Sequence, residues 1–280
     1  LLCYSWRSFH ELFAFGSKLL LSGLLDTIYR NIYPIVIGKL FSASSLGHYT
    51  RAHQFSEFPS SNITGIIKRV TYPVLCSIQN DDERLSNIYR RFLKLSAFVI
   101  FPMMTGLSAV SKPLIFMTIG SQWEICAILL PIICFSMMWY PIHSINLNLL
   151  QVKGRSDLFL RLEIIKKLLG VLVICITAPW GLVVMCYGSI VSSLIALVIN
   201  TYYTGKLIHI GFFKQMRDLV PTLLLAFAMF ILIRIINVYI DSIYLQLVIG
   251  TVFGLVFYLG CSFLFRFKEL EELISLVRKK

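Results

Sequence analysis

The stretch LVVMCYGSIVSSLIALVINTYYT, residues 182–204, decides the class of fold because it contains no charged side chain over its whole length. A helix rises about 1.5 Å per residue, so a stretch of this length spans the roughly 30 Å hydrocarbon core of a bilayer. Hydrocarbon offers no water to backbone N–H and C=O groups, so an apolar segment that crosses it must satisfy them internally as a helix. We therefore predict a transmembrane helix at residues 182–204.

Seven further stretches are long and apolar enough for the same interpretation. The eight predicted spans are residues 12–38, 46–78, 92–120, 123–150, 158–179, 182–204, 219–236 and 243–265. The predicted fold class is therefore all-α, a polytopic membrane helix bundle over residues 1–265. The second span contains Arg51, Glu57 and Lys68 among its polar residues, so we interpret it as a polar helix that faces the bundle interior.

Composition supports a membrane protein and argues against other classes. The chain is 57% hydrophobic and 14% charged, whereas a soluble domain has about 25% charged residues. The net charge of +12 does not indicate nucleic-acid binding, because the basic residues lie in short gaps between spans and at the C-terminal end. The seven cysteines are scattered without a CxxC motif, so we predict no metal site and interpret them as packing residues.

The basic residues also predict how the chain crosses the membrane. Lysine and arginine are rich in the gaps after the second, fourth and sixth spans and at the C-terminal end, and sparse in the other gaps. Basic loops stay in the cytoplasm, so both ends of the chain are predicted to be cytoplasmic. Residues 266–280, RFKELEELISLVRKK, are predicted to form a cytoplasmic amphipathic cationic tail on the anionic leaflet.

Charges inside the predicted spans are the first candidates for a functional site. Asp26 and Arg30 lie four residues apart, on one face of a helix. A charge at mid-membrane costs about 2.5–3.5 kcal/mol on insertion scales, so it normally pairs or lines a cavity. The two residues are either a self-neutralising pair or a cavity site. In a cavity, Arg30 would meet an anionic substrate and Asp26 would hold it or a coupling cation.

The second span supplies three more candidates for the same cavity. Arg51, His53 and Glu57 are close together in sequence, and the planar fork of an arginine suits phosphate because it donates two parallel hydrogen bonds. The alternative for Arg51 is that its side chain reaches the interface near the outer end of the span. His53 taken alone is more typical of a packed or solvated histidine than of a proton relay.

Two weaker sets of candidates come from later spans. His143 and Asn146 end the fourth span, where polar side chains either hydrogen-bond neighbouring helices or line a wet path. Glu163, Lys166 and Lys167 share one face of the next helix. They favour a salt-bridged elbow at the interface, with a gate or a contact to the substrate head group as the alternative.

Motifs of known enzymes are missing from the sequence. It contains no HExxH, no GxSxG and no Walker A lysine loop. We therefore predict that the protein is not an enzyme and has no catalytic residue or cofactor. Without a nucleotide site, energy for transport would come from a H⁺ or Na⁺ gradient or from removal of product.

Six stretches resemble a known family of membrane proteins, the lipopolysaccharide and capsule flippases of the O-antigen repeat unit type. This family is the polysaccharide transporter branch of the multidrug/oligosaccharidyl-lipid/polysaccharide exporter superfamily. The resembling stretches are LGHYTRAHQ (46–54), FPSSN (58–62), VTYPVL (70–75), QNDDE (79–83), YPIHSINLNLLQVKGRSDLFLRLEIIKK (140–167) and NTYYTGKLIHIGFFK (200–214). The resemblance covers essentially the whole chain, and long matches such as NLLQVKGRSDLF make it specific for the family although not for its substrate.

The resemblance implies both a fold and a function. The implied fold is a two-lobed exporter that works by rocking-bundle alternating access. The chain begins with Leu1, and we expect it to be the C-terminal lobe of such a protein. The implied function is flipping of undecaprenyl-diphosphate-linked oligosaccharide repeat units across the bacterial inner membrane for surface polysaccharide biosynthesis.

The resemblance also implies partners and leaves alternatives open. The expected partners are the lipid-linked oligosaccharide, membrane lipids and the polymerase or assembly proteins of polysaccharide synthesis. A multidrug or cation exporter of the same fold is one alternative, and a dominantly acidic cavity would favour it. A membrane-embedded glycan polymerase or ligase is the other, and it would predict a long basic loop outside the membrane.

Overall fold

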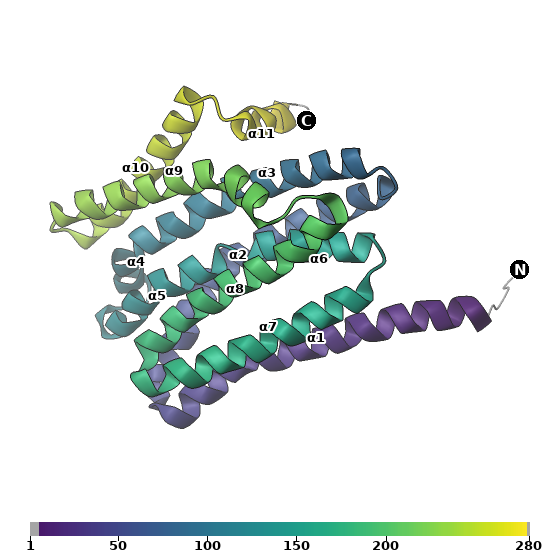
Figure 1. Ribbon diagram of the computed structural model, residues 1–280. Helices are drawn as coiled ribbons and strands as arrows, with labels where there is room; N and C mark the ends of the chain where they lie inside the picture. The colour runs from purple at the N-terminus through teal and green to yellow at the C-terminus, as the bar shows by residue number, and fades with distance from the viewer. Residues whose placement is uncertain (1–5, 279–280) are drawn as a thin grey trace, which may run out of the picture.

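The computed structural model describes residues 6–278 as a bundle of helices in which no described residue belongs to a strand (Figure 1). The helices are α1 (Trp6–Leu40), α2 (Ala43–Ser77), α3 (Asp82–Ala109), α4 (Ser111–Thr118), α5 (Glu124–Met137), α6 (Tyr140–Val152), α7 (Ser156–Thr177), α8 (Leu182–Ile208), α9 (Phe212–Val238), α10 (Ile243–Leu264) and α11 (Lys268–Arg278). Two 3₁₀ turns, η1 (Ser121–Trp123) and η2 (Ala178–Trp180), precede α5 and α8.

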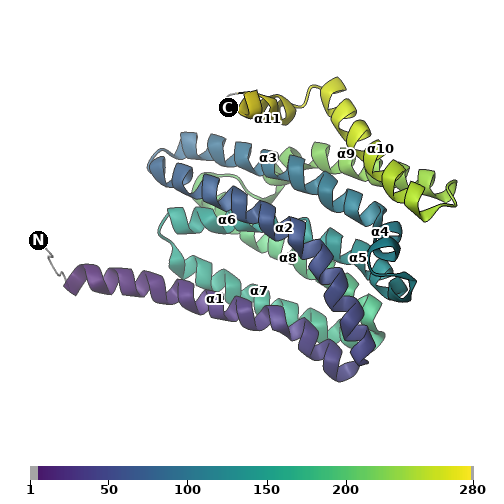
Figure 2. The same cartoon turned by 180° about the vertical axis from the view of Figure 1, so that it is seen from behind.

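The long helices run back and forth along one direction. α1 lies beside α7 on one side of the bundle, and α10 and α11 lie on the other side (Figures 1 and 2). Between them, α2 packs against α5 and α6, and α3 packs against α9. We call the end where α2 joins α3, α6 joins α7 and α8 joins α9 the basic end, because its connections carry the arginines and lysines noted above.

Six segments among the described residues are long and apolar enough to cross a membrane, which confirms the all-α membrane fold. They are Leu12–Leu40, Asp82–Ala109, Ser121–Val152, Leu182–Ile208, Phe212–Val238 and Ile243–Leu264. The helices over the other two predicted spans, α2 and α7, are long enough but are interrupted by polar and charged residues. The prediction that residues 46–78 and 158–179 cross the membrane therefore stays a prediction.

Two predicted spans, 92–120 and 123–150, each contain parts of two helices. α3 begins at Asp82 rather than near residue 92, because the carboxylate of Asp81 accepts a hydrogen bond from the Arg84 backbone N–H at 3.0 Å and caps the helix. The predicted span 123–150 is divided into α5 and α6. Pro141, in the first turn of α6, lacks a backbone N–H and is tolerated at a helix start.

A close approach between α1 and α7 positions the later site. Gly170 of α7 faces the ring of Tyr29 on α1, and a Cβ atom at Gly170 would lie 2.7 Å from Tyr29 Cζ. A larger residue at this position would therefore push the helices apart. The glycine allows the charged residues on the neighbouring turns of the two helices to reach one another.

Hydrogen bonds and an ion pair between side chains join α9 to α3 and α6. The buried amides of Asn146 on α6 and Gln215 on α9 exchange hydrogen bonds at 3.0 and 3.1 Å, and Thr204 of α8 donates to Asn146 Oδ1 at 2.8 Å. At the basic end, Arg90 of α3 makes a bidentate ion pair with Asp218 of α9, at 2.6 and 2.7 Å. These contacts fix the registers of four helices, α3, α6, α8 and α9, against one another.

The C-terminal tail forms a separate short helix that packs back onto the bundle. Phe267, Leu270 and Leu273 pack against the hydrophobic core, and Arg91 of α3 makes an ion pair with Glu272 at 2.8 Å. The cationic end of the predicted tail, residues 279–280, lies outside the described residues. Residues 1–5 of the predicted bundle lie outside them as well.

Candidate functional cavity

A half-open cavity of about 550 Å³ lies between α1, α2, α5, α6, α7 and α8. Tyrosines, serines and charged residues dominate its polar lining. The polar and charged lining residues are Ser22, Asp26, Tyr29, Arg30, Tyr33, Tyr49, His53, Lys68, Ser136, Tyr140, His143, Ser144, Asn148, Gln151, Glu163, Lys166, Lys167, Ser189, Ser192 and Ser193. Such a wall is suited to a hydrated or hydrogen-bonding ligand inside an otherwise apolar bundle.

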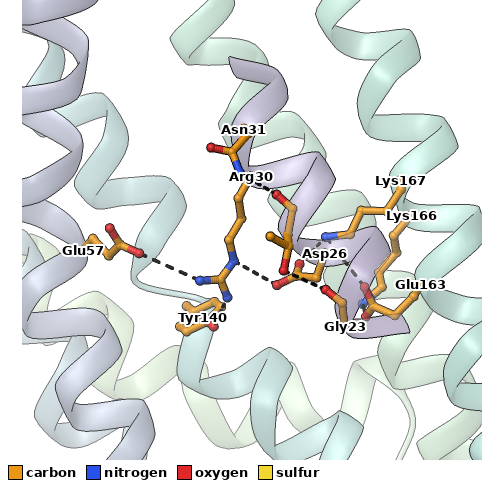
Figure 3. A network of polar contacts seen from close by, with 10 residues as sticks. Gly23, Asp26, Arg30, Asn31, Glu57, Tyr140, Glu163, Lys166 and Lys167 are labelled. Carbon is orange, nitrogen blue, oxygen red and sulfur yellow. Dashed lines mark hydrogen bonds and ion pairs between the residues drawn. The ribbon is translucent and has the colours of Figure 1, made fainter. Parts of the chain in front are cut away.

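Asp26 is the centre of a cluster of ion pairs in this cavity (Figure 3). One carboxylate oxygen accepts a hydrogen bond from Arg30 Nε at 2.8 Å, and the other accepts from Lys167 Nζ at 2.5 Å. The first contact is within α1 and follows from the spacing of four residues. The second joins α1 to α7. These helices approach each other closely at Gly170, because glycine has no side chain.

The cluster continues from Arg30 toward α2 and α6. Arg30 Nη2 donates to the Tyr140 hydroxyl at 2.6 Å, and Arg30 Nη1 lies 3.9 Å from Glu57 (Figure 3). His53 lies 3.4 Å from the other oxygen of Glu57. A single guanidinium therefore contacts side chains of α1, α2 and α6.

On the side of α7, Glu163 binds both lysines. It accepts a hydrogen bond from Lys166 at 2.5 Å and lies 3.6 Å from Lys167. The side chain of Glu163 is 6% exposed and that of Lys166 is 11% exposed. Burial of this extent requires that the charges compensate one another, because an isolated buried ion loses its hydration. The predicted salt bridges within the triplet are present, and Lys167 joins it to α1 through Asp26. Its position at the membrane interface stays a prediction.

His143 occupies a different part of the cavity. Its Nδ1 receives a hydrogen bond from the Asn200 amide nitrogen at 3.3 Å, and its Nε2 lies 3.2 Å from Ser193 Oγ. Ser193 in turn donates to the Ser136 carbonyl oxygen at 3.0 Å. His143 therefore links α6 to α8 and, through Ser193, to α5.

The predicted site residues divide into those that the structure brings together and those that it does not. Asp26, Arg30, His53, Glu57, Glu163, Lys166 and Lys167 form one connected cluster. Arg51 does not line the cavity, and its guanidinium donates to Gln54 on the same helix at 3.0 Å. Asn146 is buried between helices with Gln215. Lys68 of α2 also lines the cavity.

Sequence reasoning missed the hydroxyl groups of the cavity. Tyr29, Tyr33, Tyr49 and Tyr140 line it, as do Ser189, Ser192 and Ser193. The serines were detectable in principle, because their spacing of three and four residues places them on one face of an otherwise apolar helix. Among the described residues, no group of three or more histidine, cysteine, aspartate and glutamate side chains could hold a metal ion.

Long apolar helices around a polar cavity define a multi-pass membrane protein. The fold is that of a solved structure titled "Lipid II flippase MurJ, inward closed conformation". The two structures share a TM-score of 0.72 and 17% sequence identity, over 94% of this chain and 56% of the other. Residues 2–128 match a family model described as "Polysaccharide biosynthesis protein".

The chain is also similar to curated proteins. An "Uncharacterized membrane protein in cps region" of Klebsiella pneumoniae is 25% identical over 98% of this chain and 57% of its own length. The "Lipopolysaccharide biosynthesis protein WzxC" of Escherichia coli K12 is 25% identical over 67% of this chain and 37% of its own length. The chain thus spans about half the length of the curated relatives it matches. The resemblance to polysaccharide exporters that the sequence indicated is confirmed.

Proposed function

We propose that the protein flips a lipid-diphosphate-linked oligosaccharide across the bacterial inner membrane, for the synthesis of a surface polysaccharide. The observation that carries this proposal is the Arg30 guanidinium, which lines a cavity inside a predicted membrane span. Relatives named for lipopolysaccharide biosynthesis and succinoglycan transport support the same activity. So does the fold shared with a structure titled as a lipid II flippase.

The charge of the cavity favours an anionic substrate. Among its lining residues, the cations are Arg30, Lys68, Lys166 and Lys167, and the acids are Asp26 and Glu163. The cations remain in the majority when Glu57, which pairs with Arg30, is added to the acids. A diphosphate diester carries a negative charge on each phosphate, so this balance suits it and argues against a dominantly cationic cargo.

Binding of a diphosphate requires an exchange of partners inside the cluster. Arg30 and Lys167 are both held by the carboxylate of Asp26, so phosphate oxygens replace that carboxylate when they bind. A displaced carboxylate in a poorly hydrated site takes up a proton or a cation. This exchange would couple substrate movement to a H⁺ or Na⁺ gradient.

The polar cavity addresses the main barrier to flipping. Glycan and phosphate groups cannot enter hydrocarbon without losing their hydration, and the hydrogen-bonding wall replaces part of it. The prenyl tail remains in the lipid. We orient the basic end toward the cytoplasm, because basic connections resist translocation.

Surface polysaccharide export in cells tests this function. Deletion of the complete gene should abolish the surface glycan and trap lipid-linked repeat units on the cytoplasmic leaflet. Restoring the gene with Arg30→Gln should leave export about tenfold or more below wild type, since a charge-assisted contact is lost. Arg234→Gln is the matched control, because Arg234 lies on α9 and does not line the cavity. Normal export by a well-expressed Arg30→Gln protein would contradict the proposal.

A further inference from the structure

The surplus positive charge of the cavity belongs to one side chain. In the ion-pair cluster, three cations balance three acids, namely Arg30, Lys166 and Lys167 against Asp26, Glu57 and Glu163. Lys68 of α2 is the one other lysine, arginine, aspartate or glutamate in the described cavity lining. Its side chain is exposed and makes no ion pair or hydrogen bond with a described residue. Lys68 is therefore a cation without a counter-ion, beside a cluster that is neutral as a whole.

Lys68 lies between this cluster and the basic end. α2 runs toward the basic end, where it joins α3 (Figure 2). Lys68 follows Glu57, the partner of Arg30, by eleven residues, which is about 16 Å along a helix axis and returns to nearly the same face. Gln151, near the end of α6, and Phe159, near the start of α7, also line the cavity. The cavity thus extends from the cluster toward the basic end, and Lys68 lines this extension.

A phosphate meets different resistance at the two positions. At Arg30 and Lys167 it has to displace the carboxylate of Asp26, which holds both cations. At Lys68 it displaces only water, because no described acid pairs with the ammonium group. The balanced cluster also has no net charge with which to attract an anion from a distance. An uncompensated charge at the approach to a cleft does attract it and raises the association rate.

We propose that Lys68 is the entry contact for the diphosphate, a proposal that rests on the function proposed above. A phosphate that enters from the basic end reaches Lys68 first and binds there without breaking an ion pair. It then passes to Arg30, where it exchanges with the Asp26 carboxylate. Lys68 thus determines how fast the substrate enters the cavity, and Arg30 determines how tightly the substrate is held.

Binding kinetics of farnesyl diphosphate to the complete protein in nanodiscs of zwitterionic lipid test this role. Lys68→Gln should lower the association rate constant about threefold to tenfold and weaken its dependence on salt, because a charge at the rim of a site acts mainly on association. The dissociation rate constant should change by about twofold or less. Arg69→Gln is the matched control, since Arg69 is an exposed neighbouring cation that does not line the cavity. Arg69→Gln and Lys68→Arg, which keeps the charge, should both associate at nearly the wild-type rate.

The possible outcomes separate the entry contact from the proposed function. Failure of the wild-type protein to bind the probe would overturn both. An unchanged association rate in Lys68→Gln, or an equal decrease in Arg69→Gln, would overturn the entry contact alone. So would an effect of Lys68→Gln on dissociation only, because Lys68 would then hold the bound substrate. Lys68→Gln breaks no contact in the structure, so it should melt at the wild-type temperature. A clearly lower melting temperature would show that Lys68 is a structural residue and would overturn the proposal.

Discussion

Arg30 lies between two carboxylates and a tyrosine hydroxyl, and this position determines what the cavity can bind. Arg30 contacts Asp26, Glu57 and Tyr140, although its side chain remains 51% exposed. The same carboxylate of Asp26 also holds Lys167. The protein thus supplies its own anions in the place where a substrate phosphate would bind, and the two compete.

Replacing Asp26 by asparagine tests this competition at the level of one residue. Asp26→Asn keeps the shape of the side chain but removes the charge that neutralises Arg30 and Lys167. Farnesyl diphosphate should then bind about tenfold more tightly to the protein in nanodiscs, which corresponds to about 1.4 kcal/mol. Export in cells should become slower, because the substrate is released less readily. Weaker binding of the probe by a folded variant would exclude Asp26 as a competing anion.

Spacing within one helix made part of this site predictable from the sequence. Asp26 and Arg30, and likewise Glu163, Lys166 and Lys167, share a helix face by spacing alone. Their meeting across α1 and α7 was not predictable, because it depends on how two distant helices pack. Arg51 shows the same limit, since a charge in a predicted span does not reveal which way its helix faces.

At the scale of helices, the α1–α7 contact depends on the absence of a side chain at Gly170. Its neighbour Tyr29 lines the cavity one turn from Asp26. The separation of the two helices therefore sets whether Lys167 can reach Asp26.

Gly170→Val should destabilise the protein and weaken the cluster together. Overpacking of this kind costs typically 1–3 kcal/mol, and a thermal-shift measurement in detergent should show a clear decrease in melting temperature. Gly260→Ala on α10 is the control, since a Cβ there would meet nothing within 4 Å. A melting temperature for Gly170→Val equal to that of the control would mean that α1 and α7 are not closely packed at this point.

The Arg90–Asp218 ion pair should stabilise the contact between α3 and α9. The Asp218 side chain is 5% exposed, so Asp218→Asn leaves Arg90 without its buried counter-charge, at a cost of about 1.5–3 kcal/mol. Asp157→Asn provides a matched comparison. The Arg155–Asp157 pair is also bidentate, but both of its side chains are nearly half exposed, so solvent screens the pair and it contributes little to stability. Denaturant unfolding should rank the variants in this order, and the reverse order would contradict it.

Helix types were easier to predict than helix ends. Apolar length in the sequence indicated the long helices, although the charges of α2 and α7 keep these two out of the six segments that are apolar enough to cross a membrane. The ends depended on local hydrogen bonds such as the Asp81 cap, and the division between α5 and α6 was not predicted. At the end of α5, Ser60 Oγ of α2 donates a hydrogen bond to the Met137 carbonyl oxygen at 2.9 Å. A contact between distant helices such as this one is not visible in the sequence.

At the scale of the whole molecule, α2 has an exposed side that does not line the cavity. Arg51, Gln54 and Asn62 are exposed on it together with Phe58. Amide and guanidinium groups within a membrane span do not face lipid when water or protein is accessible. We therefore predict that Asn62 meets water or protein rather than lipid.

Thiol labelling tests this view of α2. In a variant without its native cysteines, Asn62→Cys should react with a small membrane-impermeant methanethiosulfonate reagent. Val252→Cys on α10 should not react, because Val252 is an exposed residue on an apolar helix that we assign to lipid. Equal reactivity at the two positions would remove the distinction between a wet side and a lipid side.

Flipping by purified protein in liposomes tests the central claim most directly. The measurement is the rate at which a lipid-diphosphate-linked oligosaccharide moves between leaflets. We predict that the wild-type protein and Arg234→Gln accelerate this movement equally, and that Arg30→Gln reduces the rate by about tenfold or more. Flipping at the wild-type rate by a correctly folded Arg30→Gln protein would show that the charged cavity is not the route of the substrate.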